Sequence, residues 1–455
     1  MKSNILSINP SNYEILGEIE TSSDRDIIYK AHRARFMQKK WKSVIVEKRA
    51  GLLKILNEKF IKNKTLISQL VTKEIGMPIS QSLGDVDFAV DYLNWYIANA
   101  SKFLLPEVSY KDDKLTHMVF REPLGVAAVI TSWNFPLSNF VWGVAQNLLV
   151  GNTVIYKPSE ECALFGKYLE NMVNNIFPEG VLSIIHGDGK VGDSLIHQDI
   201  NLISFTGSVK VGKYIYEVAG KKFIKAVCEL GGSAPGIVFP DADLDLAVET
   251  IYENRFNNCG QICDGLKRLI VHKSIFNNVV DKLKNKLNSI KIGNPEDEST
   301  QIGPMVAERQ LIFLEKQVNY AKKMGAKTVM GGERLNTFHG AFYKPTILID
   351  IKTGMKVWQE EVFGPVLPIV SFDTLEGAVK MANDTKYGLG AYIFTRDLER
   401  ANKVAKQIDT GMVSINGASY IQPSSPFGGY KDSGVGREHG RFGFEELTQI
   451  KVVAS

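Results

Sequence analysis

The sequence has few cysteines and no long apolar run, and both absences narrow the class of protein. Its 455 residues include only four cysteines, and none of them forms a Cys-x-x-Cys pair. A disulfide-rich secreted domain is therefore excluded, and a reducing compartment is expected. No run of about 18 uncharged apolar residues is available to cross a membrane, and the N-terminus lacks an apolar signal segment. These features predict a cytoplasmic protein with no membrane partner.

Blocks of like charge are also missing. The 54 basic and 50 acidic residues are interspersed and give a formal net charge of +4. An arm that binds nucleic acid needs a cluster of basic residues, so no nucleic-acid partner is expected. Cys259 and Cys263 are spaced so that they could share a metal ion, but no group of histidines or further cysteines accompanies them. No metal site is predicted.

The length and the apolar pattern predict an α/β protein with more than one structural unit. A chain of 455 residues exceeds the usual size of a single core. Over residues 126–232, short apolar runs alternate with helical patterns, as in a doubly wound parallel sheet, and the alternation returns over residues 236–424. Ligands of such sheets bind beyond the carboxyl ends of the strands. Four positions fall at those ends in the first sheet: Asn134, Lys157, Gly207 and Glu229.

Elements outside the sheets can also be predicted. Apolar residues at helical spacing predict helices over 44–62, 66–74 and 86–103, and Gly76 is expected to end the second of them. Residues 1–20 are expected to form an extended lead-in with a turn at 9–12. Strands are predicted over 115–120, 223–227 and 447–453.

A thiol in a polar, turn-forming segment is the first candidate for chemistry. Cys263 is the candidate nucleophile, because a thiolate is strongly nucleophilic and modest help from donors or a helix N-terminus activates it. Gly260 and Gly265 on either side allow the backbone and a substrate to approach closely. A single cysteine is more often a small buried hydrophobe, so other residues must decide between the two interpretations.

Two upstream segments supply groups that a thiol nucleophile needs. Glu229 lies between an apolar run and a Gly-Gly turn, where its carboxylate could deprotonate a water molecule. The alternative is a solvated loop acid. Asn134 follows a predicted strand, and its amide can donate hydrogen bonds to a developing oxyanion. The alternative is an ordinary turn residue.

Together these segments closely resemble the motifs of the NAD(P)-dependent aldehyde dehydrogenase superfamily. The resemblance covers almost the whole chain and continues through Tyr156-Lys157-Pro158-Ser159-Glu160, Phe205-Thr206-Gly207-Ser208, Glu361-Val362-Phe363-Gly364-Pro365 and Pro426-Phe427-Gly428-Gly429-Tyr430-Lys431. It implies two doubly wound parallel-sheet domains and a small oligomerisation β-sheet. It assigns residues 1–107 and 125–231 to a dinucleotide-binding domain, 232–424 to a catalytic domain, and 108–124 with 425–455 to oligomerisation strands and a C-terminal segment. A homodimer or homotetramer is expected.

The resemblance also implies the cofactor residues. The phosphates are expected near the start of a helix opened by the segment that contains Gly207, Ser208 and Gly212, where helix N-terminal amides suit an anion. A literal G-x-G-x-x-G at residues 187–192 is not favoured, because the acid expected about 20 residues later is absent. The remaining implied contacts are Lys157 and Glu160 with the adenine-side ribose, Trp133 with the pyrophosphate, and Glu361 and Phe363 with the nicotinamide ribose and ring.

Glu160 bears on the choice between the two cofactors. A carboxylate accepts a hydrogen bond from a ribose 2′-hydroxyl but repels a 2′-phosphate. NAD is therefore expected, with NADP possible.

The resemblance implies oxidation of an aldehyde to a carboxylic acid. Cys263 would attack the carbonyl, Asn134 and the Cys263 backbone N–H would hold the oxyanion, and Glu229 would activate the water that hydrolyses the thioester. The alternatives are a succinate-semialdehyde-type dehydrogenase, a CoA-acylating enzyme, which would generally lack the Glu229 base, and a binding protein that has kept the fold without the chemistry.

The substrate pocket is expected to be uncharged or tolerant of aromatic groups. Trp142 stands where members selective for succinate semialdehyde often have an arginine, and segment 418–425, which includes Tyr420, contains no arginine. Asp264 next to the nucleophile departs from the small or neutral residue common there. Its carboxylate is expected to point away, because facing the thiol it would raise the thiol pKa and slow attack.

Overall fold

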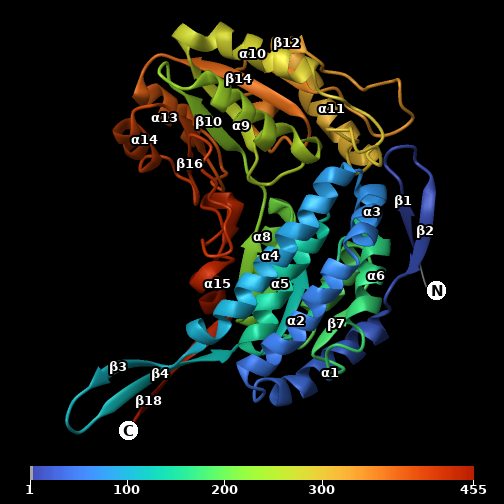
Figure 1. The fold of residues 1–455 in the computed structure, drawn as a ribbon, viewed down its shortest axis with the longest axis vertical. Coiled ribbons are helices and arrows are strands. Elements are labelled where there is room, and N and C mark those ends of the chain that lie inside the picture. The colour runs from blue at the N-terminus through green and yellow to red at the C-terminus, as the bar shows by residue number, and fades with distance from the viewer. Residues whose placement is uncertain (1–3) are drawn as a thin grey trace.

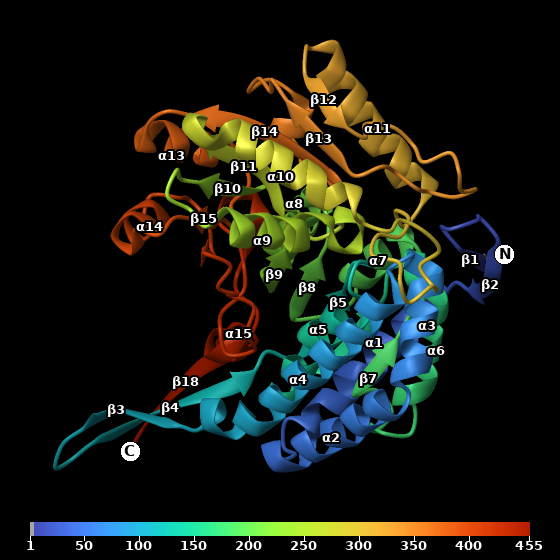
Figure 2. The same cartoon turned by 45° about the horizontal axis from the view of Figure 1, so that its top comes forward.

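Two large sheets, built mainly of parallel strands, organise the computed structural model, which describes residues 4–455. One sheet with its helices forms the lower part of Figure 1 and the other forms the upper part, and a three-stranded sheet projects at the lower left. The view in Figure 2 keeps the same separation of the two units. The predicted fold class, two parallel-sheet units with a small additional sheet, is confirmed.

The first large sheet has six strands in the order β17-β9-β8-β5-β6-β7. Their bounds are β5 (Val126–Ile130), β6 (Thr153–Lys157), β7 (Leu182–Ile184), β8 (Leu202–Thr206), β9 (Lys225–Glu229) and β17 (Gly434–Val435). Strands β5 to β9 are parallel, and β17 pairs antiparallel with β9. The chain winds outward through β6 and β7 and then returns to the other side of β5 for β8 and β9. The sheet is therefore doubly wound, and its switch point lies between β5 and β8.

The helices of the first unit pack around this sheet. They are α1 (Asp24–Trp41), α2 (Val46–Lys62), α3 (Lys64–Ile75), α4 (Ile79–Leu104), α5 (Pro136–Val150), α6 (Ala163–Val173), α7 (Gly189–Ile196) and α8 (Val209–Lys222). The predicted helices over 44–62, 66–74 and 86–103 are thus confirmed with shifted ends. Gly76 ends α3 in the left-handed conformation, with φ of 76°.

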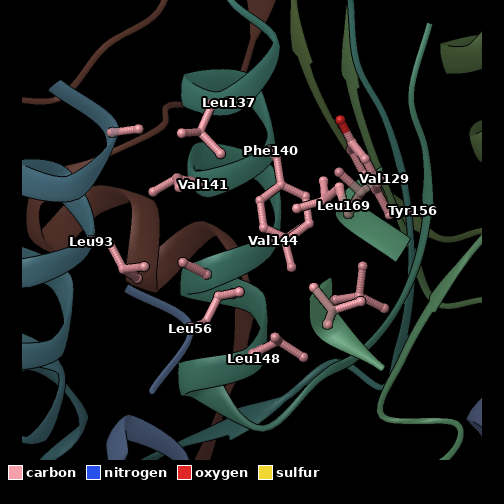
Figure 3. Close-up of a cluster of buried hydrophobic side chains, with 14 of the residues drawn as sticks. Leu56, Leu93, Val129, Leu137, Phe140, Val141, Val144, Leu148, Tyr156 and Leu169 are labelled. Carbon is pink, nitrogen blue, oxygen red and sulfur yellow. The ribbon is translucent and has the colours of Figure 1, made fainter. Parts of the chain in front are cut away.

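Helix α5 lies at the centre of the first core. Its sequence is apolar on almost every side, because it packs between the sheet and other helices. Figure 3 shows Phe140 and Leu148 of this helix with Leu56 of α2 and Tyr156 of β6 in one cluster. The Phe140 and Tyr156 rings meet edge to face with centroids 5.0 Å apart. This packing fixes the helix that follows the Asn134 segment.

The second large sheet has seven strands in the order β12-β13-β14-β11-β10-β15-β16. Their bounds are β10 (Ala234–Val238), β11 (Leu266–His272), β12 (Lys327–Met330), β13 (Thr346–Ile349), β14 (Val366–Phe372), β15 (Tyr392–Phe394) and β16 (Ser414–Ile415). All neighbours are parallel except β12, which is antiparallel to β13. The helices of this unit are α9 (Leu244–Phe256), α10 (Phe276–Asn288), α11 (Glu308–Lys323), α12 (Lys356–Gln359), α13 (Leu375–Asn383) and α14 (Leu398–Ala405).

The third sheet is antiparallel, with strand order β18-β4-β3. Its strands are β3 (Glu107–Lys111), β4 (Thr116–Pro123) and β18 (Thr448–Ala454). The predicted strands over 115–120 and 447–453 therefore pair with each other. Its role in oligomerisation stays a prediction, as do the functions assigned to the other parts of the chain.

Three local expectations differ from the structure. The predicted extended lead-in, of which residues 1–3 lie outside the described residues, is a hairpin in which β1 (Asn4–Ile8) pairs antiparallel with β2 (Ile15–Glu20), and the turn predicted at 9–12 joins the two strands. The predicted strand over 223–227 begins only at Lys225, because Phe223 ends α8 in the left-handed conformation and is 99% exposed. The C-terminal segment also contributes β17 to the first sheet and forms α15 (Gly440–Glu446) before it reaches the third sheet.

The short crossing from β9 to β10 determines where the two units meet. Strand β9 ends at Glu229 and β10 begins at Ala234. The carboxyl ends of the first sheet therefore face the amino ends of the second sheet. Asn134 follows β5, and Cys263 precedes β11, so both come to this junction from opposite sheets.

Candidate functional site

Cys263 lies in the loop between the short 3-10 helix at Asn257–Gly260 and β11. Its side chain is partly exposed and packs on an apolar group that we call the thiol-side cluster, formed by Leu389, Met412, Phe427, Tyr420 and Ile421. Gly260 has a φ of 72°, and a Cβ there would lie 2.4 Å from the Gly364 carbonyl oxygen. The glycine is therefore needed for contact with the 361–365 segment, and not only for turn formation. Cys259, in contrast, is buried, and burial raises its thiol pKa to about 12.

The carboxylate of Asp264 faces the thiol, which corrects the expectation that it points away. Its Oδ1 lies 3.9 Å from the Cys263 Sγ, and its Oδ2 accepts a hydrogen bond of 3.0 Å from the Tyr420 hydroxyl. The Tyr420 bond fixes the carboxylate in this direction. Burial raises the pKa of Cys263 well above its usual value, and the Asp264 charge raises it further, whereas Lys267 opposes both.

Glu229 is the last residue of β9 and is only 3% exposed, so it is not a solvated loop acid. Within residues 4–455, neither of its carboxylate oxygens has a hydrogen-bond partner. Its backbone is held firmly, since its carbonyl accepts a bond of 3.0 Å from the Gly207 N–H and its strand pairs with β17. Burial raises its pKa well above the usual value, and the neighbouring Glu438 raises it further. A raised pKa makes this carboxylate a stronger base than an ordinary exposed one.

Asn134 reaches the Cys263 loop directly. Its Nδ2 donates to the Gln261 carbonyl at 3.1 Å, and its own backbone carbonyl accepts from the Asn258 amide at 2.8 Å. The orientation of the amide is fixed because Oδ1 accepts a bond of 2.8 Å from the Ser132 hydroxyl. Among the described residues, Nδ2 donates only to Gln261. Its second N–H is therefore free to donate to a substrate oxygen.

The chemistry of the donors at the carboxyl ends of the first sheet fits a dinucleotide. Lys157 is 3% exposed, and its Nζ lies 3.7 Å from the Glu160 carboxylate and donates to the Pro158 carbonyl at 3.0 Å. Ser208 is the N-cap of α8, so the helix begins at the end of β8. An ammonium group, an exposed carboxylate and a helix N-terminus would hold a ribose and a diphosphate.

Two glycines near this helix have packing roles. A Cβ at Gly212 would lie 2.4 Å from a methyl carbon of Leu230, so the glycine lets α8 approach the end of β9. Gly192, the last glycine of the literal G-x-G-x-x-G, would place a Cβ 3.6 Å from the Lys157 side chain. This segment therefore passes near the lysine that the resemblance assigns to the ribose, with room for one further carbon atom between them.

Glu361, Phe363 and Trp133 meet on the other side of the junction. The Trp133 and Phe363 rings are edge to face with centroids 5.6 Å apart. The Glu361 Oε1 accepts from the Gly232 N–H at 3.2 Å and forms a short ion pair with Lys267. These residues would hold the nicotinamide end of a dinucleotide, because a carboxylate accepts ribose hydroxyls and aromatic edges border a flat ring.

Trp142 and Tyr420, the two expected pocket residues, both lie near Phe427. The Trp142 and Phe427 rings stack with centroids 6.4 Å apart, and Phe427 and Tyr420 both belong to the thiol-side cluster. Their role in binding a substrate stays a prediction. Asp264 adds a negative charge close to the thiol, whereas the sequence analysis expected its carboxylate to point away from the site.

Two buried charged residues near the junction were missed. Lys267 is fully buried beside the Cys263 carbonyl, and Glu438 is buried near Glu229, where burial raises its pKa to about 7. In the sequence, Lys267 stands beside the apolar run Leu269-Ile270-Val271, which is typical of a buried strand, and a charge in such a strand needs a partner. That conflict is the signal that could have identified it. Within residues 4–455, no group of three or more His, Cys, Asp or Glu side chains is placed to hold a metal ion.

The same part of the chain has no helix that is long and apolar enough to span a membrane.

Comparisons with known proteins agree with this arrangement. The model of the aldehyde dehydrogenase family matches residues 1–453. An aminoaldehyde dehydrogenase of Pisum sativum is 38% identical over 465 residues, which covers 99% of this chain and 92% of that protein. An aldehyde dehydrogenase of Aspergillus niger is 35% identical over 98% of this chain and 90% of its own length.

Solved structures share the fold. A betaine aldehyde dehydrogenase of Staphylococcus aureus in complex with NAD+ has a TM-score of 0.95 and 31% identity, and the match covers 100% of this chain and 91% of the other. An NADP-dependent enzyme of E. coli has a TM-score of 0.96, also at 31% identity, over 100% and 95% of the two chains. Since the family model and these relatives match along nearly the whole length, the chain belongs to the aldehyde dehydrogenase family.

Proposed function

We propose that this protein oxidises an aldehyde to a carboxylic acid with NAD or NADP, through a thiohemiacetal and a thioester on Cys263. The observation that supports this most strongly is the meeting of three segments at the junction of the two sheets. Asn134 is hydrogen-bonded to the loop of Cys263, and the crossing that follows Glu229 lies against the same loop, where a Cβ at Gly232 would be 2.5 Å from the Cys263 carbonyl oxygen.

Each side chain has one task in this reaction. The Cys263 thiolate attacks the aldehyde carbon, and the free N–H of Asn134 donates to the oxyanion that forms. A bound nicotinamide supplies a hydride acceptor. Glu229 then takes a proton from the water that attacks the thioester, and its unpartnered oxygens are able to accept that water's hydrogen bond. A CoA-acylating enzyme does not need such a base, so the position of Glu229 favours hydrolysis.

NAD is the proposed cofactor, with NADP as the alternative. The Glu160 carboxylate is partly exposed beside Lys157, where it can accept a ribose 2′-hydroxyl but repels a 2′-phosphate. Among the similar structures, one is an NAD+ complex and another is described as NADP-dependent, so the fold accommodates both.

The proposed substrate is an uncharged aldehyde. The thiol-side cluster is apolar and aromatic, and the Asp264 carboxylate lies 3.9 Å from the thiol. A succinate-semialdehyde-type activity, the alternative, needs a cation for the distal carboxylate. Lys267, the cation at the Cys263 loop, is fully buried and already paired with Glu361.

Cys263→Ala is expected to abolish aldehyde oxidation while NAD still binds, because the thiol forms the covalent bond and the cofactor residues lie on other segments. NADH formation is measured by absorbance, and NAD affinity by quenching of tryptophan fluorescence. Cys259→Ala is the matched control and should keep most of the activity, because that thiol is buried. Substantial turnover by Cys263→Ala would contradict the assignment.

Glu229→Gln is expected to block release of the acid more than formation of the thioester. Rapid mixing with aldehyde and NAD should give a burst of about one NADH per active subunit, because acylation needs only the thiolate, the oxyanion donors and a hydride acceptor. The later steady state should be slower by roughly 10² to 10⁴, which is the usual scale of general-base catalysis. In the wild-type protein the rate of this step should rise with pH as Glu229 loses its proton, since its pKa is raised. Loss of the burst itself would assign Glu229 to activation of the thiol instead.

Glu160→Ser is expected to narrow the preference for NAD over NADP, because it removes the charge that repels a 2′-phosphate. The measurement is kcat/KM for both cofactors with one aldehyde. Glu161→Ser is the control, because Glu161 is paired with Arg309. An unchanged ratio in Glu160→Ser would show that this carboxylate does not contact the adenosine ribose.

Succinate semialdehyde is expected to have a kcat/KM about tenfold or more below that of pentanal, a neutral aldehyde of similar length, because Asp264 repels the distal carboxylate. Asp264→Asn should reduce this ratio. The readout is the ratio of kcat/KM for pentanal to kcat/KM for succinate semialdehyde. The absolute rates are not used, because the substitution removes a charge that raises the thiol pKa, and this removal should speed the reaction of both aldehydes. A preference of the wild-type protein for succinate semialdehyde would favour the alternative.

A further inference from the structure

Lys267 is a cation with no exposure to solvent, and all the hydrogen-bond donors of its ammonium group have partners. The three N–H donors of the Nζ match three acceptors: the Gly232 carbonyl at 3.0 Å, the Cys263 carbonyl at 3.0 Å, and the Glu361 Oε1 in a short ion pair. The Nζ also lies 5.0 Å from the centroid of the Phe363 ring. A buried charge is costly unless it is paired in this way, so the three contacts are needed for Lys267 to remain charged.

The three acceptors belong to three segments with different proposed tasks. Gly232 lies on the crossing that begins at Glu229, the proposed base. Cys263 is the proposed nucleophile itself. Glu361 is a proposed ligand of the nicotinamide ribose. One side chain therefore holds the base segment, the nucleophile loop and the cofactor carboxylate at fixed distances from one another.

We propose that Lys267 is a positioning residue that couples the cofactor carboxylate Glu361 to the nucleophile Cys263, so that it sets both the affinity for the dinucleotide and the reactivity of the thiol. The inference rests on the proposed function, which assigns the tasks of the three segments. It adds a residue that acts through its neighbours and contacts no reacting atom.

The two oxygens of Glu361 divide this work. Oε1 accepts from both the Lys267 ammonium and the Gly232 N–H, whereas Oε2 accepts no hydrogen bond from residues 4–455. A Cβ at Gly231 would lie 2.1 Å from Oε2, so the absence of a side chain there leaves room for the carboxylate. Lys267 thereby orients Glu361 with one oxygen occupied and the other free to accept ribose hydroxyls.

The charges that face the thiol make a separate readout possible. They come from four segments: Asp264 on the loop itself, Lys267 on β11, Glu361 before β14 and Glu229 at the end of β9. Burial and the three carboxylates raise the thiol pKa, and Lys267 lowers it. Lys267 and Glu361 therefore act on the thiol with opposite signs, although they form one ion pair.

Three variants test the proposal on the full-length protein. Lys267→Met removes the charge and keeps a side chain of similar length. Glu361→Gln removes the partner charge at a partly exposed position, so it provides a folded variant if Lys267→Met is unstable. The third is the double variant. Arg268→Met is the matched control, because Arg268 is equally buried on the same strand but binds the Ser233, Met381 and Ala382 carbonyls.

The rate of Cys263 alkylation by iodoacetamide, measured without cofactor across a pH series, is the first readout. Cys259→Ala serves as the background, so that Cys263 is the thiol followed. Lys267→Met should shift the profile to higher pH and slow alkylation at neutral pH, and Glu361→Gln should shift it to lower pH and speed alkylation. The double variant should return toward the parent rate, and Arg268→Met should leave the profile unchanged.

The dissociation constant for NAD, measured by calorimetry, is the second readout. Lys267→Met should weaken binding by about tenfold, the scale of coupling between residues that share one network. Glu361→Gln should weaken NAD binding as well. The double variant should bind NAD no more weakly than the single variant that binds it less tightly, because both changes disturb the same carboxylate.

Shifts of the same sign in Lys267→Met and Glu361→Gln, or unchanged profiles and affinities in folded variants, would overturn the proposal and leave Lys267 a purely structural residue. A wild-type protein that forms no NADH from any aldehyde would instead overturn the proposed function. The alkylation profiles would still decide the role of Lys267 in that case, since they require neither turnover nor cofactor.

Discussion

The short crossing from β9 to β10 is the constraint on which the arrangement of the site depends. With Glu229 at the end of one strand and Ala234 at the start of the next, the carboxyl edge of the first sheet has to meet the amino edge of the second. Two glycines make the crossing narrow enough for both edges to touch it. Gly231 lies against the Glu361 carboxylate, and Gly232 lies against the Cys263 carbonyl. A larger side chain at either position would separate the segments that carry the proposed base, nucleophile and cofactor ligand.

The electrostatic interactions between the charged groups at this junction are strong, because these groups are removed from water. Glu229, Asp264 and Lys267 are all buried, and a charge in such surroundings acts on its neighbours over a longer range than it would at the surface. Their balance raises the pKa of the thiol, since burial and Asp264 act in the same direction and Lys267 opposes them. A thiol reacts with oxidants and with substrates as the thiolate, so a raised pKa slows both reactions. Reactivity therefore depends on groups that change the balance of charge around Cys263.

The regular elements could be predicted from the sequence because their signals are local. The helix predicted over 44–62 is α2, which ends at Lys62 as expected, and Gly76 marked the end of α3. The pairing of β17 with β9 could not be predicted, because its two residues carry no periodic pattern and the contact joins distant parts of the chain. Phe223 shows the opposite error, since an aromatic residue in an apolar run ended a helix instead of starting a strand.

Side-chain direction at the site was the part that sequence could not supply. Cys263, Glu229 and Asn134 could be proposed as site residues from their segments, but the burial of Glu229 depends on how β17 and the C-terminal segment cover the end of β9.

Asp264 faces the thiol because Tyr420, which is far away in the sequence, holds its other oxygen. Lys267 also has a partner that is distant in the sequence, since Glu361 lies in the connection before β14. In each case a local rule gave the wrong or an incomplete answer, and a long-range polar contact decided the geometry. Buried charges inside apolar segments are therefore positions where this sequence conflicts with its own local pattern, and two of them, Glu229 and Lys267, act on the nucleophile.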